Sequence, residues 1–223
     1  PAVRVLLPPA SQRAMATRVG QWLPAGNEGA GKVIAAGSSD MAQALLGKRV
    51  GAFGGEFFAN YRNVPAMQCL PLGDDLTAAD GASCFVNPMT ALGFVETARM
   101  ENHKAIVHAA AASNLGQMLN RICLEDGIPL VNIVRSEQQV ALLKGQGAQV
   151  VVNSSADDFE TQLAAAIEAT GATIAFDPIG GGTLANSILT AMEAAAQKRM
   201  PEWSRYGSDE HKQVYIYGML DPA

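Results

Sequence analysis

The sequence predicts an α/β protein, with a doubly wound parallel sheet preceded by a smaller β-rich module. Beyond residue 103, short apolar runs alternate with segments of helical spacing as far as residue 217. Parallel strands need crossover connections, and these are usually helices. Before residue 77, short apolar stretches are instead separated by glycine-rich turns. The second part of the chain is therefore expected to be a parallel sheet covered on both faces.

The elements can be placed in order along the chain. The first part is predicted to hold strands at 31–36 and 48–53, separated by a turn at 37–40, a helix start at 77–80 and helical segments on each side of Asn87-Pro88. The second part is predicted to run as strand 105–108, helix 114–125, strand 130–134, helix 136–145, strand 149–152, helix 157–170, strand 173–176, helix 183–198 and strand 214–217. The polar segment 198–212 is expected to be a solvated loop, with a flap over a cofactor or partner subunit as the alternative.

The composition is that of a folded protein without a footprint for nucleic acid. Of the 223 residues, 48% are hydrophobic and 17% are charged, which excludes a mainly disordered chain. The 16 Lys and Arg against 21 Asp and Glu leave a net charge of −5, so the surface would repel phosphate backbones. No apolar run approaches the roughly 20 residues needed to cross a bilayer, and residues 1–5 lack the order of a signal peptide.

The cysteines point to a reducing compartment. Cys69, Cys84 and Cys123 are odd in number and far apart, so neither a disulfide framework nor a closely spaced metal clamp is expected. A cytoplasmic protein fits this pattern best. His103, His108 and His211 are also isolated, so each is interpreted as a surface or strand residue, and no catalytic acid, base or nucleophile is assigned.

Ligands of doubly wound sheets bind beyond the carboxyl ends of the strands, so functional residues are expected in the loops that follow the strands. Residues 109–116 are small and lead directly into a helix, whose N-terminus offers free N–H donors and positive dipole charge to a phosphate. Only Gly116 remains of the three glycines in the dinucleotide-binding pattern Gly-x-Gly-x-x-Gly. A phosphate cradle and simple helix-on-sheet packing both stay open for this loop.

Arg135 follows the second strand, where dinucleotide-binding proteins place a group for the adenosine ribose. A guanidinium can hold a 2′-phosphate with two hydrogen bonds and offers nothing specific to a bare diol. The charge favours NADP over NAD, and a solvated Arg at a helix start is the alternative. Gly180, Gly181 and Gly218 follow later strands, where they either admit a ligand or serve as turn residues.

Three features together resemble the medium-chain dehydrogenase/reductase superfamily, and most closely its zinc-independent quinone oxidoreductase and enoyl reductase branches. They are the glycine cluster 26–33, the segment Asn87-Pro88-Met89-Thr90-Ala91 and the run 104–153. In this superfamily a GroES-like catalytic domain precedes a Rossmann domain that binds NADP(H). The resemblance implies a partial GroES-like domain at residues 1–88 and a Rossmann NADP-binding domain at residues 89–223 without its C-terminal end, so the chain looks like a fragment.

Carried over by position, the resemblance implies a cofactor site. Residues 113–116 would lie under the diphosphate, Arg135 would hold the 2′-phosphate, and residues near the two later loops and the 87–91 segment would line the nicotinamide side. The implied set is Asn87, Thr90, Ala112, Ser113, Asn114, Leu115, Gly116, Arg135, Gly180, Gly181, Gly218 and Met219. Asn27 stands where zinc-dependent members have a metal-binding His, and the four-cysteine lobe is missing, so no zinc is expected. The catalytic Tyr of enoyl reductases has no match here, so catalytic residues stay unknown, and so does the activity of this chain alone.

The resemblance implies an NADP(H)-dependent oxidoreductase that transfers a hydride between nicotinamide and a quinone or another activated carbonyl or alkene. Two alternatives stay open: a trans-2-enoyl thioester reductase and a non-catalytic nucleotide-binding module. The expected partner is a small-molecule substrate, and neither nucleic acid nor a membrane is expected. Exposed edge strands in such domains often pair, which favours a homodimer.

Overall fold

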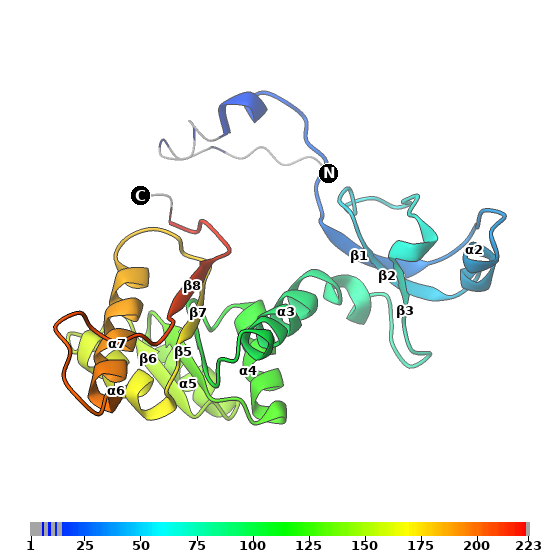
Figure 1. Cartoon of the computed structure of the whole chain (residues 1–223). Helices are drawn as coiled ribbons and strands as arrows, with labels where there is room; N and C mark the ends of the chain where they lie inside the picture. Colours follow the sequence, from blue (N-terminus) through cyan, green and yellow to red (C-terminus); the bar gives the residue numbers. More distant parts are fainter. Residues whose placement is uncertain (1–5, 7–8, 10–11, 13–14, 222–223) are drawn as a thin grey trace. The chain divides into compact units, whose positions relative to one another are not determined.

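A computed structural model describes residues 6, 9, 12 and 15–221 of the chain, so the chain start at residues 1–5 lies outside the described part. Contacts divide the chain into two compact units, Pro1–Thr90 and Ala91–Ala223. The first contains a three-stranded antiparallel sheet and the second a five-stranded parallel sheet (Figure 1). The predicted α/β architecture, with a small β-rich module before a Rossmann-type sheet, is confirmed.

The sheet of the first unit has the strand order β1-β2-β3. Its first strand, β1, lies earlier than the predicted 31–36, because the glycine cluster pairs with β2 rather than turning. Gly29 in this strand admits the Phe57 ring, whose Cδ1 would lie 2.8 Å from a Cβ at that position. The predicted strand 48–53 is confirmed, whereas α2 and β3 were not predicted. The elements are η1 (Ala16–Arg18), β1 (Glu28–Lys32), α2 (Asp40–Leu45), β2 (Arg49–Phe53), η2 (Ala66–Gln68), β3 (Cys69–Pro71) and η3 (Asp80–Ser83).

One continuous helix, α3 (Val86–Met100), replaces the two helical segments predicted around Asn87-Pro88. Pro88 lies in its first turn, where a missing N–H breaks no intrahelical hydrogen bond. Glu28 Oε2 accepts hydrogen bonds from the main-chain N–H groups of Phe85 at 2.7 Å and Val86 at 2.9 Å. The carboxylate therefore caps the helix and complements the positive end of its dipole.

The sheet of the second unit has the order β6-β5-β4-β7-β8, and all four pairings are parallel. The five predicted strands and four predicted helices are all present, with ends that differ by at most two residues. Ser113 and Ser136 cap the first two of these helices by accepting N–H bonds, as serines at such positions commonly do. The elements are β4 (Ile106–His108), α4 (Asn114–Asp126), β5 (Leu130–Val134), α5 (Glu137–Gly145), β6 (Val150–Asn153), α6 (Phe159–Thr170), β7 (Ile174–Asp177), α7 (Leu184–Arg199) and β8 (Gln213–Ile216).

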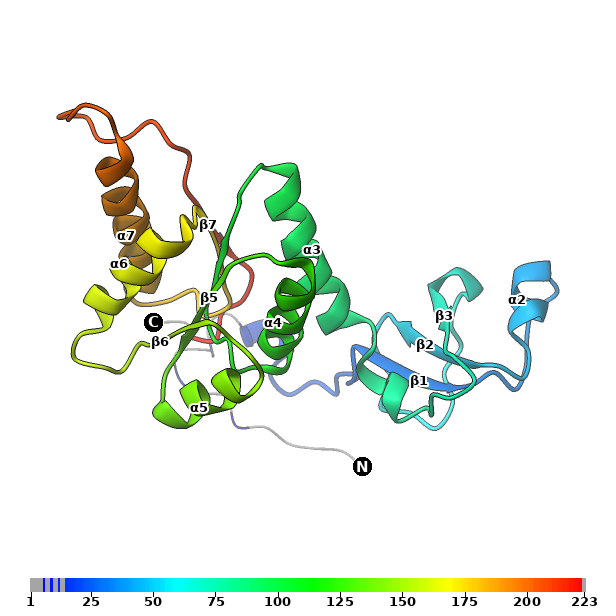
Figure 2. The same ribbon diagram turned by 90° about the horizontal axis from the view of Figure 1, so that it is seen from below.

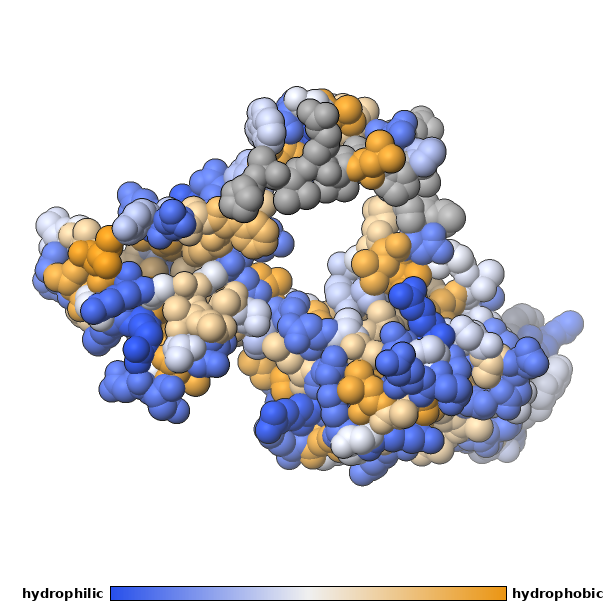
Figure 3. All heavy atoms as spheres, turned by 180° about the vertical axis from the view of Figure 1, so that it is seen from behind, coloured by the Kyte–Doolittle hydropathy of each residue, from blue (hydrophilic) through white to orange (hydrophobic). Residues whose placement is uncertain are grey.

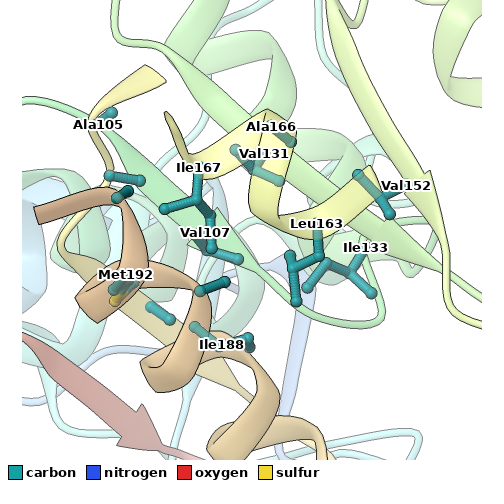
Figure 4. Packing of buried hydrophobic residues seen from close by; sticks show 14 residues of the cluster. Ala105, Val107, Val131, Ile133, Val152, Leu163, Ala166, Ile167, Ile188 and Met192 are labelled. Atoms are coloured by element: carbon teal, nitrogen blue, oxygen red, sulfur yellow. The ribbon is translucent and has the colours of Figure 1, made fainter. Parts of the chain in front are cut away.

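Helices cover both faces of this sheet, which makes three layers (Figure 2). Buried residues of α6 and α7 pack on one face, where Leu163 and Ile188 meet Val107 and Ile133 (Figure 4). Buried residues of α3 and α4 pack on the other face against Ile106, Ile174 and Phe176. Strands with two covered faces bury successive side chains, which accounts for the continuous apolar runs in the sequence.

The segment from residue 200 to 212 joins α7 to β8 without regular structure, as the sequence predicts. Glu193 on α7 holds it in place. Its carboxylate accepts hydrogen bonds from Ser208, through both N–H and hydroxyl, and from Lys212 Nζ at 2.6 Å. These bonds, that from Lys212 above all, lower the pKa of Glu193 to about 2.

Several large apolar side chains are exposed, among them Phe58, Met67, Trp203 and Tyr206. Figure 3 shows apolar residues in orange lying among hydrophilic residues in blue on the face that it presents. Apolar atoms contribute about 55–60% of the surface of ordinary folded proteins. These side chains therefore do not by themselves mark a binding surface.

Gly116 provides a test of the packing between α4 and the sheet. A Cβ at this position would overlap the main chain of Ala111, which cannot move away as a flexible side chain could. Gly116→Ala is expected to lower the free energy of unfolding by about 1–3 kcal/mol, measured by urea denaturation.

Gly93→Ala is the matched control, because Gly93 lies inside α3 with no atom within 4 Å of an added Cβ. This substitution is expected to raise the free energy of unfolding by about 0.5–1 kcal/mol. The same sign for both substitutions would contradict the packing role of Gly116.

Candidate functional site

The carboxyl ends of the five parallel strands lie along one edge of the sheet. The chain proceeds from β4 to β5 and β6, then returns to β7 on the other side of β4. The strand order therefore reverses between β4 and β7, and ligands of doubly wound sheets bind at such a point. The loops after β4, β5, β7 and β8 form the candidate site.

The loop after β4 turns sharply into α4. Ala110 adopts a left-handed φ of 50°, which is uncommon for a residue other than glycine. The N–H of Ala111 donates to the carbonyl of Ile133 at 3.0 Å, and this bond ties the loop to β5. A run of alanines suits this path because larger side chains would not fit where Ala111 is fully buried.

Two N–H groups at the N-terminus of α4 are satisfied from within the chain, one of them that of Ser113, which donates to the carbonyl of Ala110 at 2.9 Å. Ser113 Oγ accepts from the N–H of Gly116 at 3.1 Å. The N–H groups of Asn114 and Leu115 lie in the first turn, where a helix offers no intrahelical acceptor. These two donors are the ones left for an anionic ligand.

The residues predicted to lie beneath a diphosphate divide into two groups. Ser113 and Asn114 are exposed, and Ala112 is half-buried. The side chain of Leu115 is buried in the apolar core, and Gly116 is buried against Ala111. Leu115 thus presents only its main chain to the loop, and the missing side chain of Gly116 serves helix packing.

Arg135 lies immediately after β5 with an exposed side chain. Its main chain is fixed, because its N–H donates to Gln139 Oε1 at 3.0 Å and its carbonyl accepts from Ser155 Oγ at 3.1 Å. Within residues 15–221, none of the ion pairs involves its guanidinium. The backbone is therefore held at the sheet edge while the charge is available to a ligand.

The loops after β7 and β8 approach each other through their main chains. A Cβ on Gly180 would lie 2.7 Å from the carbonyl oxygen of Gly218, and one on Gly218 would lie 2.5 Å from that of Pro178. Both glycines are thus required by the contact between the loops, whatever ligand they meet. Gly181 is half-buried beside them, and Met219 is exposed.

A buried histidine lies at the carboxyl end of the central strand. His108 is fully buried, and its Nε2 is 2.9 Å from the hydroxyl of Tyr217, the residue after β8. Its Nδ1 is buried without a hydrogen-bond partner. Burial lowers the pKa of His108 to about 3, so the imidazole is neutral at physiological pH.

An aromatic cluster surrounds this pair. Phe94 stacks on Phe176 with ring centroids 4.0 Å apart, and its edge meets the Tyr217 ring at 4.8 Å. Burial, and to a smaller degree the charge of Asp177, raises the pKa of Tyr217 above its usual value. The phenol therefore keeps its proton at neutral pH.

In the first unit, a hollow of about 460 Å³ is lined by Asn27, Glu28 and Asn87 together with Gly26, Phe58, Ala82 and Val86. Asn87 is half-buried in the first turn of α3. Thr90 follows one turn later, and its hydroxyl donates to the carbonyl of Val86 at 2.6 Å. The structure thus brings Asn87 together with Asn27, the residue at which the sequence departs from the zinc-binding pattern.

The described residues contain no group of three or more His, Cys, Asp or Glu side chains arranged to hold a metal ion. Cys69, Cys84 and Cys123 are all free thiols.

In the described part of the chain, no helix is both long and apolar enough to cross a membrane.

No protein-family model matches the chain. Prostaglandin reductase-3 of Mus musculus is 26% identical over 157 residues, which are 70% of this chain and 41% of the mouse protein. A crystal structure of a candidate NADPH:quinone reductase from Mesorhizobium loti is 34% identical, with a TM-score of 0.74 over 88% of this chain and 54% of that one. The chain is thus similar to NADPH:quinone reductases, as its resemblance to the medium-chain dehydrogenase/reductase superfamily implies.

A further solved structure shares the fold. It is the Escherichia coli quinone oxidoreductase in complex with NADPH, 21% identical with a TM-score of 0.65 over 79% of this chain and 55% of that one. The chain spans about half the length of the relatives that it matches.

The sequence did not reveal the pairing of His108 with Tyr217. The two residues are 109 positions apart, and each lies in an ordinary apolar strand pattern. The expectation that His108 is a strand residue is confirmed, but its complete burial at the carboxyl end of the central strand was not predicted. The available signal was a histidine that ends the first strand of a buried parallel sheet.

The low pKa of His108 predicts a specific dependence of stability on pH. The unfolded chain, with an ordinary His pKa near 6.5, takes up a proton between about pH 6.5 and pH 3 that the folded chain does not. The contribution of neutral His108 to the free energy of unfolding is therefore fully present above about pH 6.5, and it is lost as the pH falls through this window. Between pH 7 and pH 5 the parent chain should lose about 2 kcal/mol more of its free energy of unfolding than His108→Gln.

Urea denaturation of both chains at the two pH values measures this difference, because contributions of all other groups cancel. Equal losses for parent and variant would show that His108 titrates normally.

Proposed function

We propose that this chain functions as an NADP(H)-dependent oxidoreductase that transfers a hydride between nicotinamide and a quinone or another activated carbonyl or alkene. The observation that carries the proposal is the position of Arg135, which stands exposed at the end of β5, next to the strand that leads into α4. A guanidinium there is suited to the phosphate that distinguishes NADP from NAD.

The residues of the loop after β4 fit a diphosphate. Ala112 and Ser113 are small, and the N–H groups of Asn114 and Leu115 are available at a helix N-terminus. When bound, the cofactor supplies the hydride, whereas the chain binds and orients it. Ala112, Ser113, Asn114, Leu115 and Gly116 together form this part of the proposed site.

The remaining proposed contacts lie on the nicotinamide side. In the second unit they are the loops after β7 and β8, through Gly180, Gly181, Gly218 and Met219. Asn87 and Thr90, in the first unit, are proposed on the resemblance alone. Two close main-chain contacts keep the first group rigid. A rigid loop suits a flat ring, since ordering it on binding costs little conformational entropy.

Two other functions compete with this one. The segment Asn87-Pro88-Met89-Thr90-Ala91 and the pair Val134-Arg135 favour a trans-2-enoyl thioester reductase, which is the second candidate. A non-catalytic nucleotide-binding module is the third, because only Gly116 remains of the three glycines in the dinucleotide-binding pattern. Turnover of NADPH with a quinone or with an enoyl thioester separates the two enzymes, and saturable binding without any turnover favours the module.

The proposal includes hydride transfer without zinc, since Asn27 replaces the metal-binding His of zinc-dependent members. Stoichiometric zinc in an elemental analysis would overturn this part. Three free thiols agree with a reducing compartment such as the cytoplasm. β8 ends the described sheet, and pairing of two such edges would give a homodimer.

Arg135→Ala tests the proposed cofactor preference. The variant should bind NADPH more weakly by about 1.5–3 kcal/mol, or roughly 10- to 150-fold, because a charged hydrogen-bond donor to the 2′-phosphate is lost. Affinity for NADH should stay nearly unchanged. Isothermal titration with both cofactors measures the two effects.

Arg121→Ala is the matched control, because Arg121 is an exposed arginine on α4 that pairs, among the described residues, with Glu125 alone, a surface contact at 3.7 Å. It should leave both affinities unchanged. Equal losses of NADPH and NADH affinity in Arg135→Ala would refute the assignment of the 2′-phosphate contact.

A further inference from the structure

We propose that His108 orients the hydroxyl of Tyr217 as a hydrogen-bond donor to the carboxamide oxygen of a bound nicotinamide ring. The inference rests on the proposed function and adds to it one cofactor contact, Tyr217, and one positioning residue, His108. It is based on the hydrogen bond between the two side chains and on the buried ring nitrogen that has no partner.

The unpartnered nitrogen decides the direction of the hydrogen bond. A neutral imidazole carries one N–H and one bare acceptor nitrogen. If Tyr217 donated to Nε2, the proton of His108 would sit on Nδ1, a buried N–H without an acceptor. Orphaned buried N–H groups are rarer than under-satisfied acceptors. His108 therefore carries its proton on Nε2 and donates it to the Tyr217 oxygen.

This arrangement leaves the Tyr217 proton free for a ligand. The 2.9 Å contact with His108 is the one hydrogen bond of the hydroxyl found in the described residues. His108 has no exposed surface, whereas Tyr217 is 36% exposed. A ligand at the carboxyl ends of the strands can thus reach the pair only through Tyr217, and the group it meets is the hydroxyl of Tyr217 acting as a hydrogen-bond donor.

The surroundings hold Tyr217 in place. Its N–H donates to the carbonyl of Asp177 at 3.0 Å, and Gly218, the next residue, packs on the main chain of Pro178. The ring contacts Phe94 edge-on. Because the phenol stays protonated over the whole physiological range, it can serve as a neutral donor at any working pH.

The position of Tyr217 indicates that it would contact the nicotinamide half of the cofactor rather than the adenosine half. It follows β8, which is three strand spacings from β5, or about 14 Å from the strand that carries Arg135. A dinucleotide with its 2′-phosphate at Arg135 and its diphosphate at α4 extends toward β7 and β8 with its nicotinamide half. The carboxamide oxygen is the neutral carbonyl acceptor in that half, and a neutral phenol is a suitable donor for it.

The test compares NADPH with 2′-phospho-ADP-ribose, which keeps the adenosine, 2′-phosphate and diphosphate but lacks the nicotinamide. Titration calorimetry on the full chain measures both affinities. Tyr217→Phe should bind NADPH about 3- to 10-fold more weakly, the range for one neutral hydrogen bond. Its affinity for 2′-phospho-ADP-ribose should not change.

Tyr215→Phe is the matched control, since it also removes a phenol hydroxyl from the same end of the chain. The hydroxyl of Tyr215 donates to Glu101 rather than to His108. Neither affinity should change in this variant.

Variants of His108 test its positioning role. His108→Gln keeps a side-chain N–H donor and should retain most of the NADPH affinity. His108→Leu removes the donor and should weaken NADPH binding without affecting 2′-phospho-ADP-ribose. The double variant His108→Leu/Tyr217→Phe should bind NADPH no more weakly than Tyr217→Phe alone, because the two residues act as one unit.

The double variant also covers the case in which Tyr217→Phe does not fold, since it removes both partners of the buried hydrogen bond and leaves neither unpaired. Equal losses for both ligands, or unchanged NADPH affinity, in the folded variants would overturn the inference alone. A parent chain that binds neither ligand would overturn the proposed function as well.

Discussion

Complete burial of β4 is the constraint on which the second unit depends. All three of its residues have no exposed surface, because strands flank it on both sides and helices cover both of its faces. Any polar group at its end must then be satisfied inside the protein or stay uncharged. The neutral state of His108, the alanine-rich loop and the close approach of α4 at Gly116 all follow from this confinement.

The regular half of the fold could be predicted from the sequence because its signals are local. Strand Leu130–Val134 was located to the residue, since four apolar positions, three of them β-branched, lie around Asn132 between a helix end and a capping serine. The short elements of the first unit gave weaker signals. β1 consists largely of small residues, and its strand conformation depends on pairing with β2, which no local pattern encodes.

The candidate site divides in the same way. Arg135 could be placed at a strand end because the strand itself is recognisable, and the structure puts it there with an exposed side chain. The glycines were harder to interpret. Gly116, Gly180 and Gly218 each admit main chain rather than open space, a distinction that depends on neighbours far along the chain. The bond from His108 to Tyr217 is likewise a product of tertiary structure.

The cap supplied by Ser113 stabilises the N-terminus of α4 in the absence of any ligand. Because the Ser113 hydroxyl accepts from the Gly116 amide, the first turn of α4 is capped without an anion. A glycine at that position would leave the amide to solvent. The serine therefore stabilises this turn without any ligand, and the integrity of the helix does not depend on whether a ligand binds there.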